Sequence, residues 1–274
     1  LYREAKRIEK KYIEYKVDLV FSTQPLMAYF DRPGVWAAQR LGLTTISTLT
    51  AWDNLSTKGR MPIHYSHYLV WSEWMREELI KTHPDIDNKL ITPVGPPALD
   101  FHFNNRKIMS KEKFCSLFNL DIHRPIILFS PGPSGQSPNQ PEMVERVYLA
   151  MKDGSIKNNP QLFVRSHPVG DFSYWESFKE KYPQISFSEY GGLDGDIGRD
   201  WNPTMTDLDI LIASLYHCSL MINFSSTITL EAFIYDKPVI NIAYDFDRES
   251  FFHEYTANAY SVDSYRPVVE TKST

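Results

Sequence analysis

Short apolar runs alternate with helical patterns along the first hundred residues of the chain. The runs, each of about six residues, are 17–22, 44–49, 67–72 and 89–94. Segments with helical periodicity at about 35–40 and 73–81 lie between them. Short runs of β-branched and other apolar residues that alternate with helices are typical of βαβ units, so this pattern predicts a parallel sheet.

The pattern stops in the polar stretch 100–124 and then starts again. The second set of runs is 125–130, 162–165, 185–187, 220–223 and 238–242, with helices predicted at about 142–152, 174–181, 207–216 and 227–235. We therefore place a domain boundary near residue 104 and expect an α/β protein with two Rossmann-like domains, 1–104 and 105–274. Ligands bind at the carboxyl ends of parallel strands, so two such sheets would face a cleft that holds a small molecule.

The composition of the chain argues against several classes of protein. The 274 residues contain 29 Lys and Arg against 34 Asp and Glu, a net charge of −5, so no overall basic field favours nucleic acid as a partner. Two cysteines, Cys115 and Cys218, cannot build a disulfide framework or a closed zinc site, and we expect buried free thiols. No apolar run approaches the about 18 residues of a membrane span, and no signal peptide is visible.

The most informative stretch is the end of the predicted strand 220–223 and the helix after it. Ser225, Ser226 and Thr227 lie where this helix begins, and helix N-termini bind phosphate through free backbone N–H groups. Glu231 follows Thr227 by one helical turn on the same face, so its carboxylate can accept both hydroxyls of a ribose. Alternatively, Ser226 or Thr227 caps the helix and Glu231 is a favourable first-turn acid.

Two further loops follow predicted strands of the second half. Arg165 ends one strand and can hold a phosphate bidentately, and His167 can donate to the same phosphate. Alternatively, Arg165 pairs with a neighbouring carboxylate. Gly132 and Ser134 lie in the loop after 125–130, where small residues allow the backbone to approach a ligand closely. This loop has neither the Walker nor the GxGxxG pattern, so an ordinary surface loop fits equally well.

The stretch 50–60 of the first half carries a third group of candidates. Asp53 can act as a general base towards an acceptor hydroxyl, and His64, shortly after this stretch, is an alternative base. Lys58 and Arg60 can hold an anionic substrate or a diphosphate. The Asp-Asn pair at the start of the stretch also fits a simple turn.

The sequence does not predict a metal site. The histidines lack the HExxH spacing of zinc proteases. The acidic positions from Asp194 to Asp209 lack the ordered spacing of a calcium loop, and we interpret them as loop and helix-cap acids. We therefore expect no metal and no cofactor.

The order of these motifs resembles a known family. RSHP after a strand, followed by DLDILIASLYHCSLMINFSSTITLEAFIYDKPVINI, resembles the donor-binding domain of GT-B glycosyltransferases. The same motifs are similar to those of teichoic acid glycerophosphotransferases and of capsule and lipopolysaccharide transferases. AWDNLSTKGRMP, HYLVWSEWMREELI and KLITPVGPPALDF resemble the second half of a GT-B acceptor domain. The resemblance implies a chain that is truncated at both ends.

This resemblance implies a metal-independent glycosyltransferase. It would move a sugar from a nucleotide-activated donor to a hydroxyl of a cell-surface polysaccharide or lipid-linked acceptor. The first domain would be a partial acceptor side and the second the donor side. The helix start at Ser225–Thr227, with Arg165 and His167, would neutralise the leaving diphosphate. Asp53 or His64 would deprotonate the acceptor, and the absence of an E-x7-E signature favours inversion.

Three other functions stay open. One is a CDP-glycerol-type glycerophosphotransferase, and another is a UDP-sugar 2-epimerase, which needs further catalytic acids near the donor. The third is a non-catalytic nucleotide-sugar-binding domain.

The first helix bears on where the protein acts. Its basic residues are Arg3, Lys6, Arg7, Lys10 and Lys11. They form either a solvated helix face or a contact with anionic lipid. We expect a cytoplasmic protein, with peripheral contact at the inner membrane face as an option.

Overall fold

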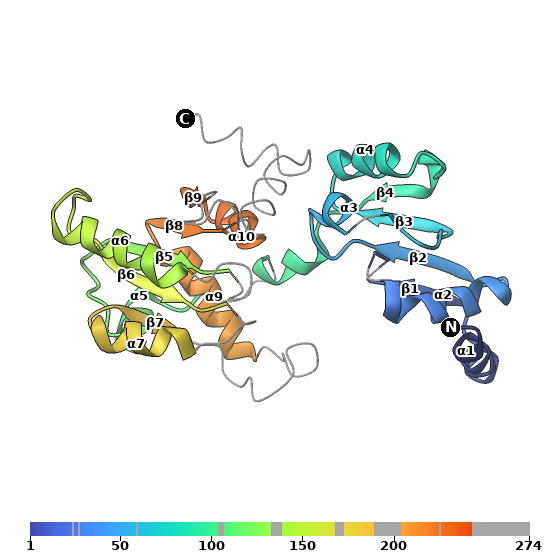
Figure 1. Cartoon of the computed structure of the whole chain (residues 1–274), viewed down its shortest axis with the longest axis horizontal. Coiled ribbons are helices and arrows are strands. Elements are labelled where there is room, and N and C mark those ends of the chain that lie inside the picture. Colours follow the sequence, from blue (N-terminus) through green and yellow to red (C-terminus); the bar gives the residue numbers. More distant parts are fainter. Residues whose placement is uncertain are drawn as a thin grey trace. The chain divides into compact units, whose positions relative to one another are not determined.

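A computed structural model of the protein describes most of the chain. The described residues are 1–23, 25–26, 28–58, 60–103, 107–132, 139–167, 173–188, 204–224 and 226–242. They form two compact units, each with its own parallel sheet (Figure 1). Unit 1 comprises residues 1–101, and unit 2 comprises residues 102–242. The prediction of an α/β protein with two parallel sheets is confirmed.

Unit 1 is built on a four-stranded sheet whose strands are neighbours in chain order, β1-β2-β3-β4. The strands are β1 (Leu19–Ser22), β2 (Thr44–Thr48), β3 (His67–Val70) and β4 (Ile91–Pro93). The helices are α1 (Tyr2–Glu14), α2 (Ala28–Arg40), α3 (Asn54–Thr57) and α4 (Glu73–Thr82), with 3-10 helices η1 (Asn88–Leu90) and η2 (Pro97–His102). Because each crossover moves one strand along in the same direction, right-handed connections place α2, α3 and α4 on one face.

The two faces of this sheet differ in burial. Ser47, Tyr68 and Val70 are at most 2% exposed, and these residues point to the covered face. On the other face, Leu19 and Phe21 of the edge strand β1 are 44% and 50% exposed. Burial in this sheet therefore follows the alternation of side chains along each strand, so one face is buried and the other is partly exposed.

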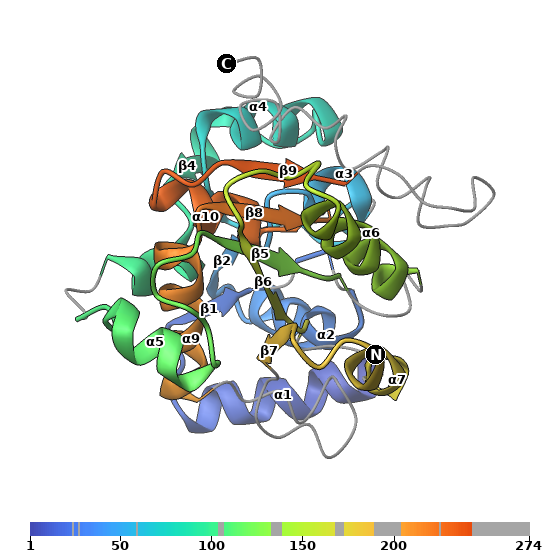
Figure 2. The same cartoon turned by 90° about the vertical axis from the view of Figure 1, so that its left-hand side faces the viewer.

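Unit 2 is built on a five-stranded parallel sheet with the order β7-β6-β5-β8-β9. Its strands are β5 (Ile126–Ser130), β6 (Gln161–Arg165), β7 (Ser186–Ser188), β8 (Leu220–Asn223) and β9 (Val239–Asn241). Its helices are α5 (Lys111–Leu117), α6 (Gln140–Lys152), α7 (Ser173–Lys181), α9 (Met205–His217) and α10 (Ile228–Ile234). Helices α6 and α7 lie on one face, and α5 and α9 on the other (Figure 2). The direction of winding reverses between β5 and β8, which makes this point the topological switch of the sheet.

The core of unit 2 is aromatic and aliphatic. All five residues of β5 and of β6 are buried, and Trp175 and Phe178 of α7 pack on one face of these strands. Cys115 and Cys218 are both buried and free, as predicted. Burial raises the pKa of the Cys218 thiol to about 11, so the thiol stays protonated at neutral pH.

A buried hydrogen-bond cluster joins the ends of β8 and β9 to the start of α10. Asn223 and Thr229 have no exposed surface. The Thr229 hydroxyl accepts from Asn223 Nδ2 at 3.0 Å and donates to Asn241 Oδ1 at 2.8 Å. The Ile242 N–H donates to the Asn223 carbonyl at 2.7 Å. These bonds fix the position of α10 relative to the sheet.

Replacing Thr229 with Val, which has the same shape but no hydroxyl, should destabilise unit 2 by about 1–3 kcal/mol, because the buried amide of Asn223 and the part-buried amide of Asn241 lose their partner. Urea unfolding, combined with hydrogen exchange of β8 peptides, measures the effect. Thr229→Ser keeps the hydroxyl and is the control, expected to be the milder change. Equal stability of the valine variant and the wild type would contradict this account.

Candidate functional site

The carboxyl edge of the unit 2 sheet is lined by polar residues. Ser130, Arg165, Ser188, Asn223 and Asn241 are the last residues of their strands. The strand register pairs Ser130 with Asn223, and Asn223 with Asn241. It also pairs Arg165 with Ser188. In open α/β sheets, ligands bind outside this edge at the switch point, which here lies between β5 and β8.

Helix α10 begins at this switch point. Thr227 is its N-cap residue, with helical backbone angles, and its side chain makes no capping hydrogen bond. The Thr229 N–H donates to the Ser226 carbonyl at 3.0 Å, so the first turn closes through backbone bonds. The structure therefore does not support capping by Thr227, and the hydroxyls of Ser226 and Thr227 lie on partly exposed residues. Ser225 lies outside the described residues.

Glu231 lies one turn after Thr227, as the spacing predicted, since its N–H donates to the Thr227 carbonyl at 3.3 Å. Its carboxylate Oε2 lies 3.0 Å from His102 Nε2, and its side chain is 13% exposed. The His102 side chain is completely buried, and its Nδ1 lies 2.8 Å from the Tyr235 hydroxyl. Sequence analysis missed His102, because 129 positions separate it from Glu231 and no local pattern joins them.

Hydrogen-bond chemistry fixes the direction of this chain of contacts. As a carboxylate, Glu231 only accepts, so His102 Nε2 carries the hydrogen and donates it. Burial and the charge of Glu231 raise the pKa of Tyr235, so the phenol keeps its proton, and it donates this proton to Nδ1 when the imidazole is neutral. One carboxylate oxygen accepts from His102, and a carboxylate has lone pairs for about four hydrogen bonds, so Glu231 can also accept from a ligand.

Arg165 ends β6, as the sequence predicted, and its side chain has partners inside unit 2. It is 1% exposed, and its guanidinium donates to Ser188 Oγ at 3.1 Å and to the Asp207 carbonyl at 3.0 Å. These bonds tie β6 to β7 and to the first turn of α9. A buried guanidinium needs such partners inside the protein, and the contact of Arg165 with a phosphate stays a prediction. His167, half-buried, lies two residues beyond β6 at the same edge.

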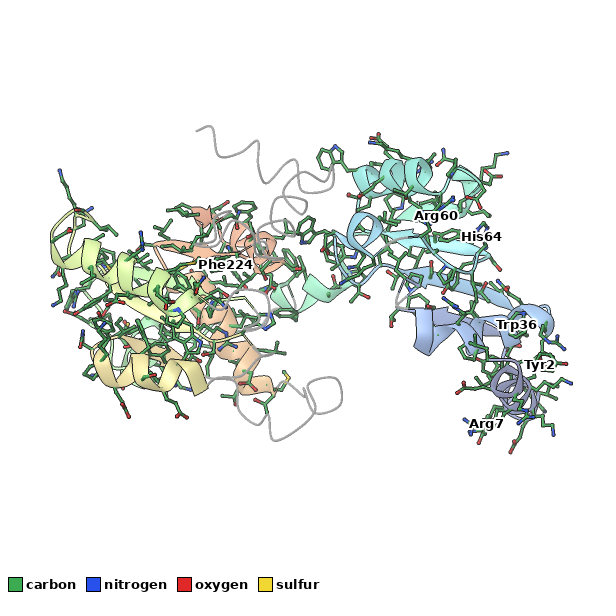
Figure 3. The ribbon with its side chains drawn as sticks, viewed as in Figure 1. Tyr2, Arg7, Trp36, Arg60, His64 and Phe224 are labelled. Atoms are coloured by element: carbon green, nitrogen blue, oxygen red, sulfur yellow. The ribbon has the colours of Figure 1, made fainter. Side chains whose placement is uncertain are left out.

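Gly132 is buried just beyond β5, and its carbonyl accepts from Gln140 Nε2 at 3.1 Å. A Cβ added to Gly132 would meet Phe224 Cβ at 3.9 Å, an ordinary contact (Phe224 is labelled in Figure 3). Packing inside the protein therefore does not demand glycine here, so close approach of a ligand remains a prediction. Ser134 lies outside the described residues.

In unit 1, Asp53 lies at the carboxyl edge of the sheet. It is 7% exposed and is the N-cap residue of α3. Asn54 Nδ2 donates to Asp53 Oδ1 at 3.3 Å, and Asn54 Oδ1 accepts from the Ala51 N–H, so the turn that was the alternative interpretation of the Asp-Asn pair is formed. Lys58 follows α3 and is exposed. The turn does not exclude a chemical role for Asp53, because its carboxylate sits where strand β2 ends.

His64 lies at the opposite edge of this sheet. It precedes the first residue of β3, and the neighbouring Ser66 Oγ accepts from the Thr45 N–H at the start of β2. Strands rise about 3.3 Å per residue, so the length of β2 separates His64 from Asp53. The structure therefore does not bring the two predicted bases together, and His64 does not share the edge of Asp53.

Arg60 and His64 instead share a carboxylate on the surface (Figure 3). Asp85 Oδ2 lies 3.0 Å from His64 Nε2, and Asp85 Oδ1 lies 3.5 Å from an Arg60 nitrogen. The Arg60 side chain is 69% exposed, and its use as an anion ligand stays a prediction.

His83 anchors the loop that carries Arg60 and His64. It is 1% exposed, its Nε2 accepts from the Met61 N–H at 2.8 Å, and its Nδ1 lies 2.9 Å from Thr82 Oγ1. Burial, and then the charge of Arg60, lower the pKa of His83. The imidazole is therefore neutral in the folded protein at pH values where it would be charged in water.

The basic helix α1 packs on α2 through buried Ala5. The Tyr2 and Trp36 rings lie 6.0 Å apart, and the Arg40 guanidinium lies over both (Figure 3). Arg7 and the other basic residues of α1 are exposed. Within the described part of the chain, no helix has both the length and the apolar character that crossing a membrane requires.

Asp207 was expected to be a helix-cap acid, and this is confirmed. Its Oδ2 accepts from the Thr204 N–H and hydroxyl, while its own N–H donates to Thr204 Oγ1, which forms a capping box at α9. The acidic positions from Asp194 to Asp200 lie outside the described residues. Among the residues with described coordinates, no group of three or more His, Cys, Asp or Glu is arranged to hold a metal ion.

Comparisons with known proteins identify the fold. No protein-family profile matches the chain, and no curated protein sequence matches it significantly. Among solved structures, it is similar to the S. aureus MnaA–UDP co-structure, with a TM-score of 0.62, 12% identity, and coverage of 96% of this chain and 71% of that chain. It is also similar to the UDP-GlcNAc 2-epimerase from Methanocaldococcus jannaschii, with a TM-score of 0.55, 16% identity, and coverage of 89% and 66%.

A third similar structure is a glycosyltransferase from Rickettsia africae ESF-5, with a TM-score of 0.50, 16% identity, and coverage of 98% and 76%. The chain spans 66% of the length of the Methanocaldococcus jannaschii epimerase. These similarities show the fold: the chain has the GT-B fold, as its motifs implied.

Because His83 is neutral when folded and titrates near pH 6.5 when unfolded, its contribution to stability is present above pH 6.5 and should be lost as pH falls through its lower folded pKa. Unit 1 should therefore unfold at lower urea at pH 5.5 than at pH 7.5. His83→Gln, whose amide oxygen can accept from Met61, should flatten this dependence, while His67→Gln, at an exposed position, should not. An unchanged pH profile of the His83 variant would refute the assignment.

Proposed function

We propose that unit 2 binds the nucleoside diphosphate of a sugar donor at the carboxyl edge of its sheet, and that the protein is a metal-independent glycosyltransferase. The observation that carries this proposal is the position of Glu231. It lies at the topological switch point, one turn after Ser226 and Thr227, which are partly exposed residues at the start of α10. A diol-binding acid next to hydroxyl and backbone donors suits a ribose joined to phosphates.

Each group has a distinct proposed role. Ser226 and Thr227, with Ser225, donate hydrogen bonds to the phosphates, and His167 donates from just beyond the end of β6, on the other side of β5. Glu231 accepts from the ribose hydroxyls. Gly132 lets the backbone approach the ligand, with Ser134 beside it in the sequence. Uridine is the favoured base, because one of the similar structures is a UDP co-structure.

Asp53, at the carboxyl edge of the unit 1 sheet, is the proposed base, and Lys58 is a candidate for binding the acceptor. Asp53 takes the proton of the acceptor hydroxyl, whose oxygen forms a bond to the anomeric carbon of the sugar. The bond from that carbon to the diphosphate oxygen breaks, and the nucleoside diphosphate leaves with the electron pair. The charge on the leaving group is what the unit 2 donors would stabilise.

A UDP-sugar 2-epimerase is the second candidate. The epimerase comparison favours it, since the Methanocaldococcus protein has a TM-score of 0.55 against 0.50 for the glycosyltransferase. Epimerisation breaks and re-forms the C2–H bond of the sugar, so it would introduce solvent hydrogen at C2.

Calorimetric titration with UDP, GDP, CDP and CMP tests the nucleotide site, and incubation with UDP-GlcNAc in D₂O, followed by NMR and mass spectrometry, separates the two reactions. Release of UDP without deuterium at C2 would support transfer, with water as the acceptor. Deuterium at C2 would replace transferase with epimerase. Failure of all four nucleotides to bind would refute the proposed function.

Asp53→Asn should leave the dissociation constant of the donor within about twofold of wild type and lower the rate of UDP release by about 10²-fold or more, because the amide cannot accept the proton. Steady-state kinetics with titration of UDP measures both. Asp85→Asn removes an exposed carboxylate at the other edge and is the matched control. A normal rate in the Asp53 variant would remove Asp53 from the base role.

A further inference from the structure

His102 lies where the chain enters unit 2, and its side chain is completely buried there. Its ring contacts Glu231 of α10 through Nε2 at 3.0 Å, and Tyr235, the C-cap residue of this helix, through Nδ1 at 2.8 Å. Glu231 and Tyr235 are four positions apart, so they lie on one face of the helix and His102 bridges them. The rings of His102 and Tyr235 also pack edge to face, with centroids 5.4 Å apart.

The contacts of His102 and the hydrogen bonds of Thr229 hold α10 from different sides. Successive helical residues turn by about 100°, so Thr229 and Glu231 point to nearly opposite sides of α10. Thr229 holds the helix from the side of the sheet, through Asn223 and Asn241. His102 holds it from the other side. A helix of seven residues is thus fixed by polar contacts on two sides.

The consequence for Glu231 is a fixed carboxylate. A glutamate side chain has three rotatable bonds, and ordering it when a ligand binds lowers affinity by the entropy lost. The bond to Oε2 orders the side chain before a ligand arrives. The remaining lone pairs stay at a fixed place beside the start of α10.

We propose that His102 is a positioning residue for nucleotide recognition: its Nε2–H orders the Glu231 carboxylate so that this group can accept the ribose hydroxyls, and Tyr235 holds the imidazole in the tautomer that can donate. The inference rests on the proposed nucleotide site. His102 itself touches no ligand in this account.

The test combines variants of His102 with a change in the ligand. Binding of UDP and of 2′,3′-dideoxy-UDP is measured by calorimetry, and the ratio of the two affinities gives the preference for the ribose hydroxyls. In wild type, we expect UDP to bind about tenfold tighter or more, as hydrogen bonds to a charged group imply. In His102→Asn, whose short amide reaches Tyr235 but not Glu231, the ratio should fall to about two.

The matched control is His102→Gln, because its amide nitrogen can occupy the place of Nε2 and should keep most of the preference. Tyr235→Phe retains the ring and loses the hydroxyl, and should reduce the preference partly. This variant also tests the proposal if His102→Asn does not fold. Glu231→Gln should lower the preference, and adding His102→Asn to it should have little further effect.

The possible outcomes distinguish failure of the positioning role of His102 from failure of the proposed nucleotide site. If the His102→Asn and Tyr235→Phe variants keep the full preference, or weaken both ligands equally, the positioning role is overturned while the nucleotide site stands. If wild type binds UDP without any preference for the ribose hydroxyls, the assignment of Glu231 to ribose fails, and the role of His102 fails with it. If wild type binds no nucleotide, the proposed function itself is refuted.

Discussion

The buried hydroxyl of Thr229 is the contact on which the arrangement of the candidate site depends. It accepts from one strand-end amide, Asn223, and donates to another, Asn241, so it joins α10 to two strands at once. Short helices have little stability of their own, because each end leaves backbone groups without partners. The positions of Ser226, Thr227 and Glu231 therefore follow from a polar contact in the interior.

The two sheets differ in a way that bears on where a ligand binds. The unit 1 strands lie in chain order, whereas the unit 2 strands reverse direction between β5 and β8. The crevice at a reversal is the place where open α/β sheets bind ligands. Within the described residues, only the unit 2 sheet has such a reversal, and the hydroxyls and the acid that suit a nucleotide lie beside it.

Polar residues near the carboxyl edge of a sheet serve two purposes that look the same in a sequence. Arg165 is the last residue of β6, and Glu231 lies in the first turn of α10. Arg165 is directed inward and donates to Ser188 and to the Asp207 carbonyl, because a buried charge is stable only with partners. Glu231 has an interior partner as well, but part of its side chain reaches the surface.

Local periodicity determined most of the secondary structure. The apolar run 220–223 coincides with β8, and 125–130 and 162–165 each match a strand to within one residue, because strand and helix periods are properties of the backbone. The one-turn spacing of Thr227 and Glu231 was predictable for the same reason. Only the tertiary structure brought His102 to Glu231, gave Arg165 its partners, and separated His64 from Asp53. These relations depend on strand order and on which end of a strand a loop leaves, and such long-range geometry has no periodic signal in the sequence.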